Sequence, residues 1–360
     1  MKIAQVISGA ESGGSKNHVL SLLEQFPSEE MILICMQKGD LYDAAKRRGV
    51  DVRLLEQKNR YDIKAGSRLV DLIRKENVDI VHSHGPRANL FAATVKNKFN
   101  KPLVTTMHSD PTLDFMGGGV KGKIFTKLNL WAYKKMDHFF AVSERFKQQL
   151  IDIGIHSIDI TTIYNGIDFE PTGKTRTLTR SDLGLTEHDL VLAMVARLHP
   201  VKGHAYAFEA LKSHPDIHLL VVGSGPYESE IREKAKGMKN IHFLGQRSDV
   251  DEIYQISDAG LLTSVSESFP LALLEAAKEK RPVITTDVGG VRELVPEDSY
   301  GWVVPSEDSG ALVKAFQEAL DCKNQGLLKQ KGYNIYTHAS ESFSAENVAK
   351  SYKNVYEKLL

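Results

Sequence analysis

Two glutamates, Glu267 and Glu275, flank the predicted start of a helix in the second half of the chain. Residues 262–275 read LTSVSESFPLALLE, a pattern that predicts an apolar strand stopping at Glu267, a turn, and a helix that carries Glu275. Pro270 suits the first turn of this helix, so the next two amides are expected to be unpaired and to favour an anion such as phosphate. Carboxylates accept hydrogen bonds from hydroxyl groups. The stretch therefore predicts a ligand with phosphate in the middle and hydroxyl groups at both ends, which is the layout of a nucleotide sugar.

The same motif also has a plain structural interpretation. Glu267 and Glu275 would fit as ordinary surface acids, because the dipole at a helix start favours carboxylates. On the binding interpretation, the residues of this stretch that hold the ligand are Glu267, Ser268, Phe269, Pro270, Leu271 and Glu275.

Arg197 and Lys202 lie on one loop that follows another predicted strand, in the run ARLHPVKGH from 196 to 204. Two cations on one loop could neutralise a diphosphate leaving group where its charge develops. Without a ligand they would be solvated surface charges. In open parallel sheets, ligands bind beyond the carboxyl ends of the strands, and this loop falls there. Its position favours the binding interpretation.

Two glycine-rich turns also follow predicted strands. Gly13 and Gly14 let the backbone approach a ligand closely, although they lack the Gly-x-Gly-x-x-Gly spacing of dinucleotide sites and a flexible turn is the alternative. Gly223 and Gly225 form the second turn. After the next strand, the run from 245 to 250 offers backbone groups that could recognise a base, and the candidates there are Gln246 and Val250.

Histidines end two strands in the first half of the chain. We expect His82 and His84 to face opposite sides of their strand and therefore not to bind one metal together, and we give His84 a structural role. His108 ends the next strand and is followed by Asp110. His108 is therefore the candidate for a polar contact or a proton carrier beside a ligand.

No group of residues has the spacing of a metal site. Asp249 and Asp251 match the Asp-x-Asp pattern of metal-dependent sugar transfer, but acids are expected at the helix start that follows Ser248. The two cysteines, Cys35 and Cys322, are too few for a disulfide framework or a Cys-rich metal site. We therefore expect neither a metal nor a resident cofactor.

The charge balance gives no reason to expect a nucleic-acid partner, because Lys plus Arg and Asp plus Glu number 46 each. The N-terminal run lacks a signal-peptide pattern, and no stretch reaches the roughly twenty apolar residues that span a bilayer. Cys35 lies in an apolar run and is expected to be a buried thiol. A cytoplasmic location follows as the expectation.

Short apolar runs alternate with helical patterns, which predicts α/β domains with doubly wound parallel sheets covered by helices on both faces. The first series of strands is expected at 3–7, 31–36, 52–55, 80–82, 103–106 and 138–142. The second series is expected at 190–196, 218–222, 241–244, 259–263, 283–286 and 301–304. Turn residues and a Thr-rich polar run separate the two series. We therefore predict one domain over 1–165, a second over 172–343, and a docked amphipathic helix over 344–360.

Five motifs of this chain match a known family. They are YNGID at 164–168, RLHPVKG at 197–203, VGSGP at 222–226, ESFPLALLE at 267–275 and PVITTDVGG at 282–290. Together they strongly resemble the GT4 family of retaining glycosyltransferases with the GT-B fold. The resemblance implies two Rossmann-like domains facing across a cleft, with a nucleotide sugar held by the second domain and an acceptor by the first. It also implies that the last helix, 344–360, crosses back onto the first domain.

The resemblance assigns roles residue by residue. Arg197 and Lys202 would hold the diphosphate, and Glu275 would bind the ribose hydroxyls. Glu267 would contact the transferred sugar. The residues it makes catalytic are His108, Glu267, Arg197 and Lys202.

In the first domain, the resemblance places Gly14 near the phosphates of the donor and His108 beside the reacting sugar. Two residues depart from the family pattern. Ser268 stands where the family usually has Gly, which would narrow the turn beside the donor sugar. Lys16 stands where an acid is common, so contacts with the acceptor or within the loop would differ.

The implied activity is metal-independent, retaining transfer of a sugar from a nucleotide sugar, in our interpretation a UDP-sugar. Front-face transfer assisted by the leaving diphosphate is the favoured mechanism. The acceptor would be a glycan, a lipid-linked sugar or a small molecule, in bacterial cell-envelope or exopolysaccharide synthesis. The alternatives are another GT-B-type enzyme, such as a nucleotide-sugar epimerase or a phosphorylase, and a two-domain protein that closes on a solute without chemistry.

Residues 120–136 combine lysines with large apolar residues and contain no acidic residue. This basic amphipathic pattern could lie on the anionic inner face of the plasma membrane. A helix that packs on its own domain is the alternative.

Overall fold

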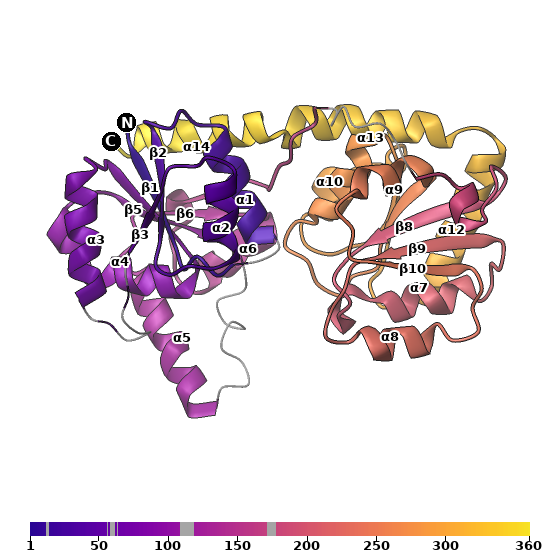
Figure 1. The fold of residues 1–360 in the computed structure, drawn as a ribbon, viewed down its shortest axis with the longest axis horizontal. Helices are drawn as coiled ribbons and strands as arrows, with labels where there is room; N and C mark the ends of the chain where they lie inside the picture. The colour runs from indigo at the N-terminus through magenta and orange to yellow at the C-terminus, as the bar shows by residue number, and fades with distance from the viewer. Residues whose placement is uncertain (12–13, 56, 58–61, 63, 109–118, 171–177) are drawn as a thin grey trace. The chain divides into compact units, whose positions relative to one another are not determined.

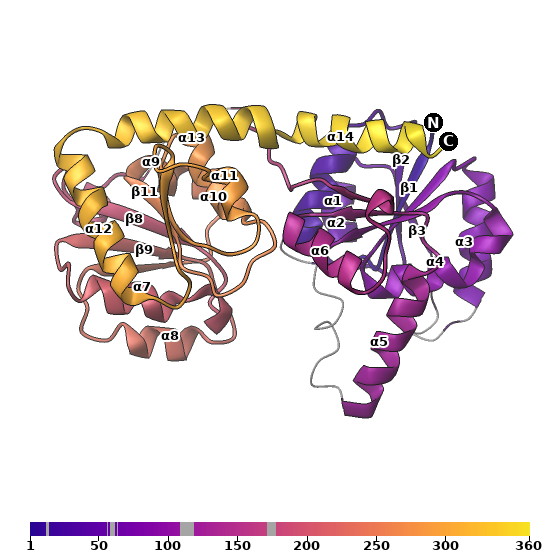
Figure 2. The same ribbon diagram turned by 180° about the vertical axis from the view of Figure 1, so that it is seen from behind.

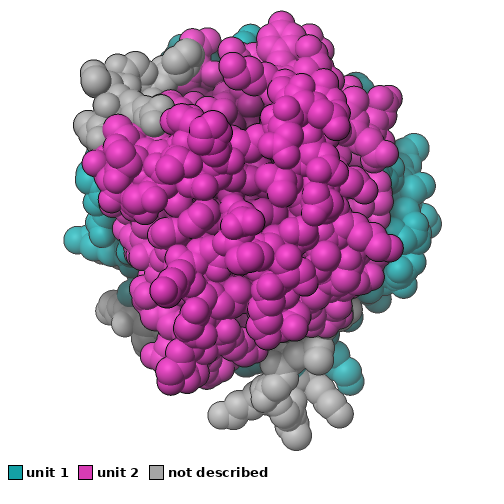
Figure 3. Space-filling view, turned by 90° about the vertical axis from the view of Figure 1, so that its right-hand side faces the viewer, with its two compact units in different colours: residues 1–168, 345–360 teal, residues 169–344 magenta. Residues whose placement is uncertain are grey.

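The computed structural model describes residues 1–360 except 12–13, 56, 58–61, 63, 109–118 and 171–177. The chain divides into two compact units. Unit 1 comprises Met1–Asp168 and Ala345–Leu360, and unit 2 comprises Phe169–Ser344 (Figure 3). Each unit has its own parallel sheet and its own core.

Unit 1 is built on a seven-stranded parallel sheet with the order β3-β2-β1-β4-β5-β6-β7 (Figure 1). Its strands are β1 (Ile3–Ile7), β2 (Met31–Cys35), β3 (Val52–Leu54), β4 (Ile80–His84), β5 (Leu103–Met107), β6 (His138–Ala141) and β7 (Ile160–Thr162). Every residue of the central strands β1 and β4 is buried, as expected for a sheet covered on both faces. The strand order reverses between β1 and β4, and this is where such sheets bind ligands.

The helices of unit 1 are α1 (Gly14–Glu24), α2 (Asp40–Arg47), α3 (Lys64–Lys75), α4 (Gly85–Phe99), α5 (Gly119–Tyr133), α6 (Glu144–Asp152) and α14 (Ala345–Lys358), with a 3-10 turn at Ser157–Asp159. Local chemistry explains several of their ends. The hydroxyl of Ser143 accepts a hydrogen bond from the amide of Phe146 and so begins α6. The left-handed Asn100, with φ of 48°, ends α4.

The last helix, α14, belongs to unit 1, although it follows unit 2 in the sequence. It lies beside α1 in both ribbon views (Figures 1 and 2). Tyr352 and Tyr356 are fully buried in the core that contains Ile3 and Met31. Their hydroxyls bond to polar side chains of β1, β4, β5 and α1, as described below. This helix therefore contributes to the interior of unit 1 rather than only covering its surface.

Unit 2 has a six-stranded parallel sheet with the order β10-β9-β8-β11-β12-β13. Its strands are β8 (Leu190–Val195), β9 (Ile217–Val222), β10 (Ile241–Gly245), β11 (Ala259–Leu262), β12 (Val283–Thr286) and β13 (Gly301–Val304). Its helices are α7 (His204–Leu211), α8 (Glu228–Lys234), α9 (Val250–Ile256), α10 (Leu271–Lys278), α11 (Val291–Leu294), α12 (Ser309–Asn324) and α13 (Leu328–Phe343), with 3-10 turns at Ser181–Leu183 and Pro200–Lys202. Leu192, Phe208 and Phe316 lie in its core.

The predicted fold class is confirmed: both units are α/β domains with doubly wound parallel sheets. The six-strand order of unit 2 repeats the order of the first six strands of unit 1, which is the Rossmann-like arrangement. One strand, β7, was not predicted, because Ile160 is the only apolar residue among its three. The apolar strand that was expected to stop at Glu267 ends at Leu262 instead. Beyond it, the side chain of Thr263 and the amide of Val265 bond to the loop after β8, which draws the chain away from the sheet.

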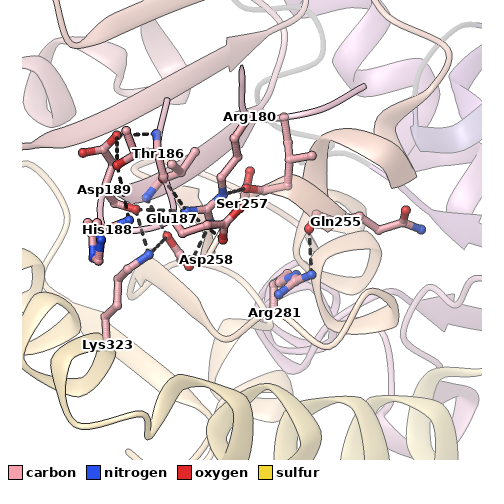
Figure 4. Close-up of polar contacts among 12 residues, drawn as sticks. Arg180, Thr186, Glu187, His188, Asp189, Gln255, Ser257, Asp258, Arg281 and Lys323 are labelled. Carbon is pink, nitrogen blue, oxygen red and sulfur yellow. Dashed lines mark hydrogen bonds and ion pairs between the residues drawn. The ribbon is translucent and has the colours of Figure 1, made fainter. Parts of the chain in front are cut away.

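A polar cluster ties together the amino ends of β8 and β11 (Figure 4). The carboxylate of Asp258 lies 3.0 Å from Nη2 of Arg180 and 2.8 Å from Nζ of Lys323, and it accepts a hydrogen bond of 2.8 Å from the amide of Val191. Arg180 is buried and donates to the carbonyl oxygens of Thr186, Asp189 and Ile256. The cluster therefore connects the two central strands to α12, at the opposite end of the sheet from the candidate site.

Candidate active site

The candidate site lies at the carboxyl ends of β8 and β11, the two neighbouring strands where the order of the unit 2 sheet reverses. The loops that follow these strands are bonded to each other. The amide of Val265 donates to the carbonyl of Val201 at 2.8 Å, and the hydroxyl of Thr263 donates to the carbonyl of Gly203 at 3.0 Å. Gly203 has a φ of 70°, and a Cβ atom there would lie 1.8 Å from the carbonyl oxygen of Thr263. Only glycine fits this close approach.

Lys202 and Glu267, predicted from separate motifs, meet in the structure. Nζ of Lys202 lies 2.5 Å from Oε1 of Glu267, and the Ser264 hydroxyl donates to the same oxygen at 2.7 Å. The Glu267 side chain is only 10% exposed and that of Lys202 is 23% exposed, so the pair is largely shielded from solvent. Ser264 was not among the predicted site residues. It is the second residue beyond β11, and a serine near the end of a strand is too common to single out from the sequence.

Arg197 lies on the same loop as Lys202 but in a different environment. Its side chain is exposed and has no hydrogen bond or ion pair to the residues that the structure describes. The glycines of the turn after β9 pack beneath this loop. A Cβ atom at Gly223 would lie 2.1 Å from the carbonyl oxygen of Ala196, and one at Gly225 would lie 2.3 Å from that of Leu198. These glycines therefore shape the loop that presents Arg197.

Helix α10 begins at Leu271, and Pro270 is the residue before its first turn rather than part of it. The prediction for Pro270 was therefore wrong by one position, because Pro270 has an extended ψ of 102°. The amide of Leu273 donates to the carbonyl of Pro270. The amides of Leu271 and Ala272 have no acceptor among the described residues. Two donors thus remain at the helix start, as the anion-binding interpretation requires.

The turn before α10 is held by hydrophobic and backbone contacts. The ring of Phe269 is buried and lies 5.0 Å from that of Phe343, between ring centres. Ser268 accepts a hydrogen bond at its carbonyl from the amide of Gly290. The buried ring of Phe269 leaves its backbone, rather than its side chain, as the group that a ligand could reach.

Glu275 lies one turn into α10 and is only partly exposed. Loss of hydration, with a smaller contribution from the negative charge of Asp251, raises its pKa from 4.5 to about 7. Because burial withholds water from this carboxyl group, its ionised form is costly to the fold. It is also well placed to accept hydrogen bonds from hydroxyl groups.

This pKa gives a prediction for stability. The unfolded state loses the proton of Glu275 near pH 4.5 and the folded state near pH 7, so stability should fall as the pH rises through that interval and then level off. Relative to Glu275→Gln, the wild-type protein should lose about 1–3 kcal/mol between about pH 5 and about pH 8, a figure that allows for its partial exposure. Urea unfolding at several pH values would measure this loss. The exposed Glu318→Gln is the control, and its curve should run parallel to wild type.

The two candidates for base recognition differ in their surroundings. Gln246 is exposed, and its side-chain oxygen accepts a hydrogen bond from the Ser224 hydroxyl at 3.3 Å. Val250 is the first residue of α9 and is partly exposed. Both lie on the segment after β10, next to the turn that carries Gly223.

In unit 1, the expectation that His82 and His84 face opposite sides was wrong, because residues two apart on a strand share a face. Their rings stack with centres 4.3 Å apart. Nδ1 of His84 lies 3.0 Å from Nε2 of His108, and the ring of His108 lies 5.1 Å from that of His18, between ring centres. Burial lowers the pKa of His18 to about 4 and the pKa values of His82, His84 and His108 well below their usual range.

This histidine cluster continues to α14, which sequence reasoning did not connect to the site. The hydroxyl of Tyr356 lies 2.6 Å from Nδ1 of His82, and that of Tyr352 lies 3.2 Å from Nε2 of His18. Gln5 bonds to Tyr356 and is fully buried in β1. A glutamine inside an apolar strand and two tyrosines one turn apart are unusual in the sequence, but nothing in it pairs them.

A hollow of about 500 Å³ opens at the carboxyl ends of β1 and β4. It is lined by Ser8, Glu11, Gln37, Gln57, His84, Gly85, Pro86 and Arg87. Gly14, three positions after Glu11 in the sequence, is the first residue of α1. Gly13 and Asp110 lie outside the described residues. The hollow is a candidate for acceptor binding within unit 1.

Two further observations concern metals and cysteines. Within the described ranges, no three His, Cys, Asp or Glu side chains are grouped so that they could hold a metal ion. Asp249 of the Asp-x-Asp pattern pairs with Arg247. Cys35 is fully buried, as expected, and burial raises the pKa of its thiol to about 12, which keeps it unreactive.

Comparison with known families covers most of the chain. The model for glycosyl transferases group 1 matches residues 175–337, and the model for glycosyltransferase family 4 matches residues 12–171. The chain belongs to the GT4-type glycosyltransferases. The motifs of this glycosyltransferase that carried the resemblance fall within or beside these matches.

Relatives of this glycosyltransferase act on different substrates. It is 27% identical to the N-acetyl-alpha-D-glucosaminyl L-malate synthase of Bacillus anthracis over 318 residues. The aligned residues make up 83% of this chain and 80% of that protein. It is 26% identical over 363 residues to the UDP-Gal:alpha-D-GlcNAc-diphosphoundecaprenol alpha-1,3-galactosyltransferase of Escherichia coli, 93% of this chain and 94% of that protein.

Among solved structures, HepE of Anabaena in complex with UDP has a TM-score of 0.86 with this glycosyltransferase. The two chains are 18% identical, and the match covers 99% of this chain and all of the other. At this identity the likeness shows the fold, which is that of GT-B glycosyltransferases.

Proposed function

We propose that this glycosyltransferase transfers a sugar from a UDP-sugar with retention of anomeric configuration and without a metal ion. The observation that carries the proposal is the arrangement at the ends of β8 and β11. There a shielded Lys202–Glu267 pair, the exposed guanidinium of Arg197 and the first amides of α10, which have no acceptor among the residues that the structure describes, belong to one edge of one sheet. The names of relatives and neighbours that bind UDP or use UDP-galactose support uracil as the base of the donor.

In this proposal, the positive groups surround the leaving diphosphate. Arg197 and Lys202 contact its oxygens, and the amides at the start of α10 contribute the partial positive charge of a helix N-terminus. Glu275 accepts hydrogen bonds from the ribose hydroxyls, and Glu267 contacts the transferred sugar. These fixed positive groups would supply the charge that a metal ion supplies in other transferases.

The residues of unit 1 complete the proposal. His108 contacts the transferred sugar, and Gly14 at the start of α1 approaches the phosphates of the donor. We further propose front-face departure of UDP, with the leaving phosphate assisting attack by the acceptor hydroxyl. This differs from retaining hydrolysis by two carboxyl groups across the bond.

A thermal-shift panel with UDP-, GDP- and ADP-sugars, with and without EDTA, tests the donor and the metal requirement. A ligand that binds only the folded state raises the melting temperature. We expect only the UDP-sugars to raise the melting temperature, and by the same amount with EDTA as without it. An equal response to all three nucleotides, or one abolished by EDTA, would contradict the proposal.

Proton NMR of the reaction mixture tests the outcome of the transfer. A retained configuration gives a product with the small anomeric coupling of the α-linked donor. A β-linked product would contradict retention. In the absence of acceptor, conversion of the donor into a different nucleotide sugar would identify an epimerase instead.

We propose that the acceptor belongs to bacterial cell-envelope or exopolysaccharide synthesis and is a glycan, a lipid-linked sugar or a small molecule. The support is the printed activity of relatives, one acting on a diphosphoundecaprenol-linked sugar and another forming a malate glycoside. Release of UDP in the presence of each acceptor class tests this. Release stimulated by none of them would contradict it.

We also propose that α5 contacts the inner face of the plasma membrane, with the enzyme in the cytoplasm. No helix in the described part of the chain is long and apolar enough to cross a bilayer. Ile124, Leu128 and Trp131 share one face of α5 and are 53%, 38% and 40% exposed. Lys127 and Lys134 are exposed on the same helix or just after it. Apolar groups next to cations fit an anionic lipid surface.

Vesicle sedimentation tests this contact. The protein should bind vesicles containing phosphatidylglycerol, and less at high salt. Trp131→Ser should weaken binding about fivefold to tenfold. The control is Ile158→Ser, which removes an isolated apolar side chain that is 86% exposed and should leave binding unchanged. Equal binding by all three proteins would contradict a membrane role for α5.

A further inference from the structure

His84 lies between Gln5 and His108 in the interior of unit 1. Its Nε2 atom is 2.5 Å from Oε1 of Gln5, and its Nδ1 atom is 3.0 Å from Nε2 of His108. A neutral imidazole has one N–H donor and one bare nitrogen that accepts. The amide group of Gln5 therefore decides which nitrogen of His84 carries the proton.

The surroundings of Gln5 fix the orientation of its amide group. Gln5 is fully buried, and its Nε2 atom lies 3.5 Å from Sδ of Met31 and 3.2 Å from the hydroxyl of Tyr356. A thioether sulfur accepts hydrogen bonds but cannot donate them, so the NH₂ group belongs on that side. The amide oxygen consequently faces His84, and His84 donates to it through Nε2–H.

The hydroxyl groups around Gln5 are consistent with this orientation. Tyr356 accepts from Gln5 and donates its own proton to Nδ1 of His82, 2.6 Å away. His82 then donates through Nε2–H to the hydroxyl of Thr106 at 2.8 Å. Tyr356 and His82 each accept one hydrogen bond and donate one, while the amide group of Gln5 donates to Met31 and Tyr356 and accepts from His84.

His84 and His108 are both neutral here. Burial is the main reason that their pKa values lie well below the usual range, and the neighbouring histidines lower them further. With its proton on Nε2, His84 presents a bare Nδ1 to His108. His108 must then donate from Nε2, and its own Nδ1 keeps a lone pair. That atom makes no hydrogen bond to any residue in the described ranges, and the side chain is partly exposed.

We propose that Gln5 and His84 are positioning residues that hold His108 in the tautomer protonated at Nε2, so that its bare Nδ1 accepts a hydrogen bond from a hydroxyl of the bound sugar. The inference rests on the proposed function, because it uses the sugar contact proposed for His108. In a neutral histidine, the hydrogen bond made by one ring nitrogen determines whether the other nitrogen carries the proton. His108 therefore meets the hydroxyl with its acceptor already in place, and no ring flip or proton shift is needed on binding.

Correlation spectra of the histidine ring nitrogens and protons test the tautomer without any substrate. At about pH 7, His108 should be protonated at Nε2 and bare at Nδ1, with its signals assigned by their loss in His108→Asn. In His84→Leu, the signals of His108 should move toward a mixture of tautomers. Wild-type His108 protonated at Nδ1, or at both nitrogens, would overturn the inference whatever the substrate is.

Kinetics of a conservative pair test the positioning role. His84→Asn places an amide oxygen where Nδ1 stood and keeps an acceptor for His108, whereas His84→Leu removes it. We expect kcat to fall about tenfold or more in His84→Leu, with a change in KM for the donor below about threefold, and to recover largely in His84→Asn. Equal losses in both variants would mean that His84 serves packing alone and would overturn the inference.

A matched control comes from the neighbouring strand β6. His138 is also buried, but it bonds to Thr161 and not to the Gln5–His84–His108 series. His138→Leu should leave kcat and the signals of His108 unchanged once its folding has been verified by thermal unfolding. A loss of kcat in His138→Leu as large as that in His84→Leu would count against a specific role for His84.

Discussion

Asp258→Ala is expected to lower the free energy of unfolding of unit 2 by about 3–5 kcal/mol. The substitution removes the carboxylate that pairs with Arg180 and Lys323, and both side chains are largely shielded from solvent. Two cations would remain close together without their shared anion. The amide of Val191 would also lose its acceptor. Breaking a buried pair from one side costs more than the pair itself contributes, because the remaining charge stays desolvated.

Urea unfolding followed by tryptophan fluorescence measures this loss. Trp302 is buried in unit 2, whereas Trp131 of unit 1 is 40% exposed, so the larger signal change reports on unit 2. Asp287→Ala is the control, because its pair with Arg292 is half-exposed and should contribute less than about 1 kcal/mol. Equal stabilities of the Asp258 and Asp287 variants would contradict the role given to the cluster.

Lys202→Ala is expected to lower kcat/KM for the nucleotide sugar by about 10²–10³-fold. In the proposed mechanism, Lys202 neutralises charge on the departing diphosphate, and it also holds Glu267 at 2.5 Å. Its removal leaves that carboxylate with the Ser264 hydroxyl and without a cation, close to the phosphates. Both effects raise the energy of the transition state. Lys202→Arg should recover part of the activity, because it restores the charge.

Lys212→Ala is the matched control for Lys202. Lys212 also pairs with a glutamate, Glu209, at 2.6 Å, but it lies exposed at the end of α7, away from the candidate site. Steady-state kinetics should give wild-type values for this variant. Activity in Lys202→Ala within about threefold of wild type would remove the lysine from the proposed mechanism.

The sequence predicted the two parallel sheets well, because nearly every strand is a compact apolar run between turn residues. Strand ends were less accurate where tertiary contacts decide them. Leu262 ends β11 because the chain beyond it bonds to the loop after β8. Pro270 precedes the first turn of α10, whereas we predicted it within that turn. Both positions accommodate a residue that has no amide proton.

The candidate site in unit 2 follows from the rule that ligands bind at the carboxyl ends of parallel strands. That rule favoured Lys202, the helix-start motif selected Glu267, and the structure joins the two. The partner Ser264 could not be selected in the same way, because a serine after a strand is too common. The glycines at 223 and 225 were interpreted as ligand contacts, and the structure adds a packing reason for both.

The polar interior of unit 1 was beyond the reach of local patterns. Gln5 and Tyr356 are 351 positions apart in the sequence, and no periodicity connects them. Only the docking of α14 brings them together. The error on His82 and His84 had a different origin, since the alternation of a strand places both on one face, and that fact was available in the sequence.

Calorimetric titration of UDP in the presence of EDTA tests the central claim, that unit 2 holds a uridine nucleotide through Glu275 and the cations of its site. We expect UDP to bind the wild-type enzyme, and to bind Glu275→Gln and Lys202→Ala at least tenfold more weakly, a loss of about 1.4 kcal/mol or more. Glu279→Gln, one turn further along and bonded to Gln255, should bind as wild type does. Absence of UDP binding to the wild-type enzyme, or equal affinity in all four proteins, would contradict the account.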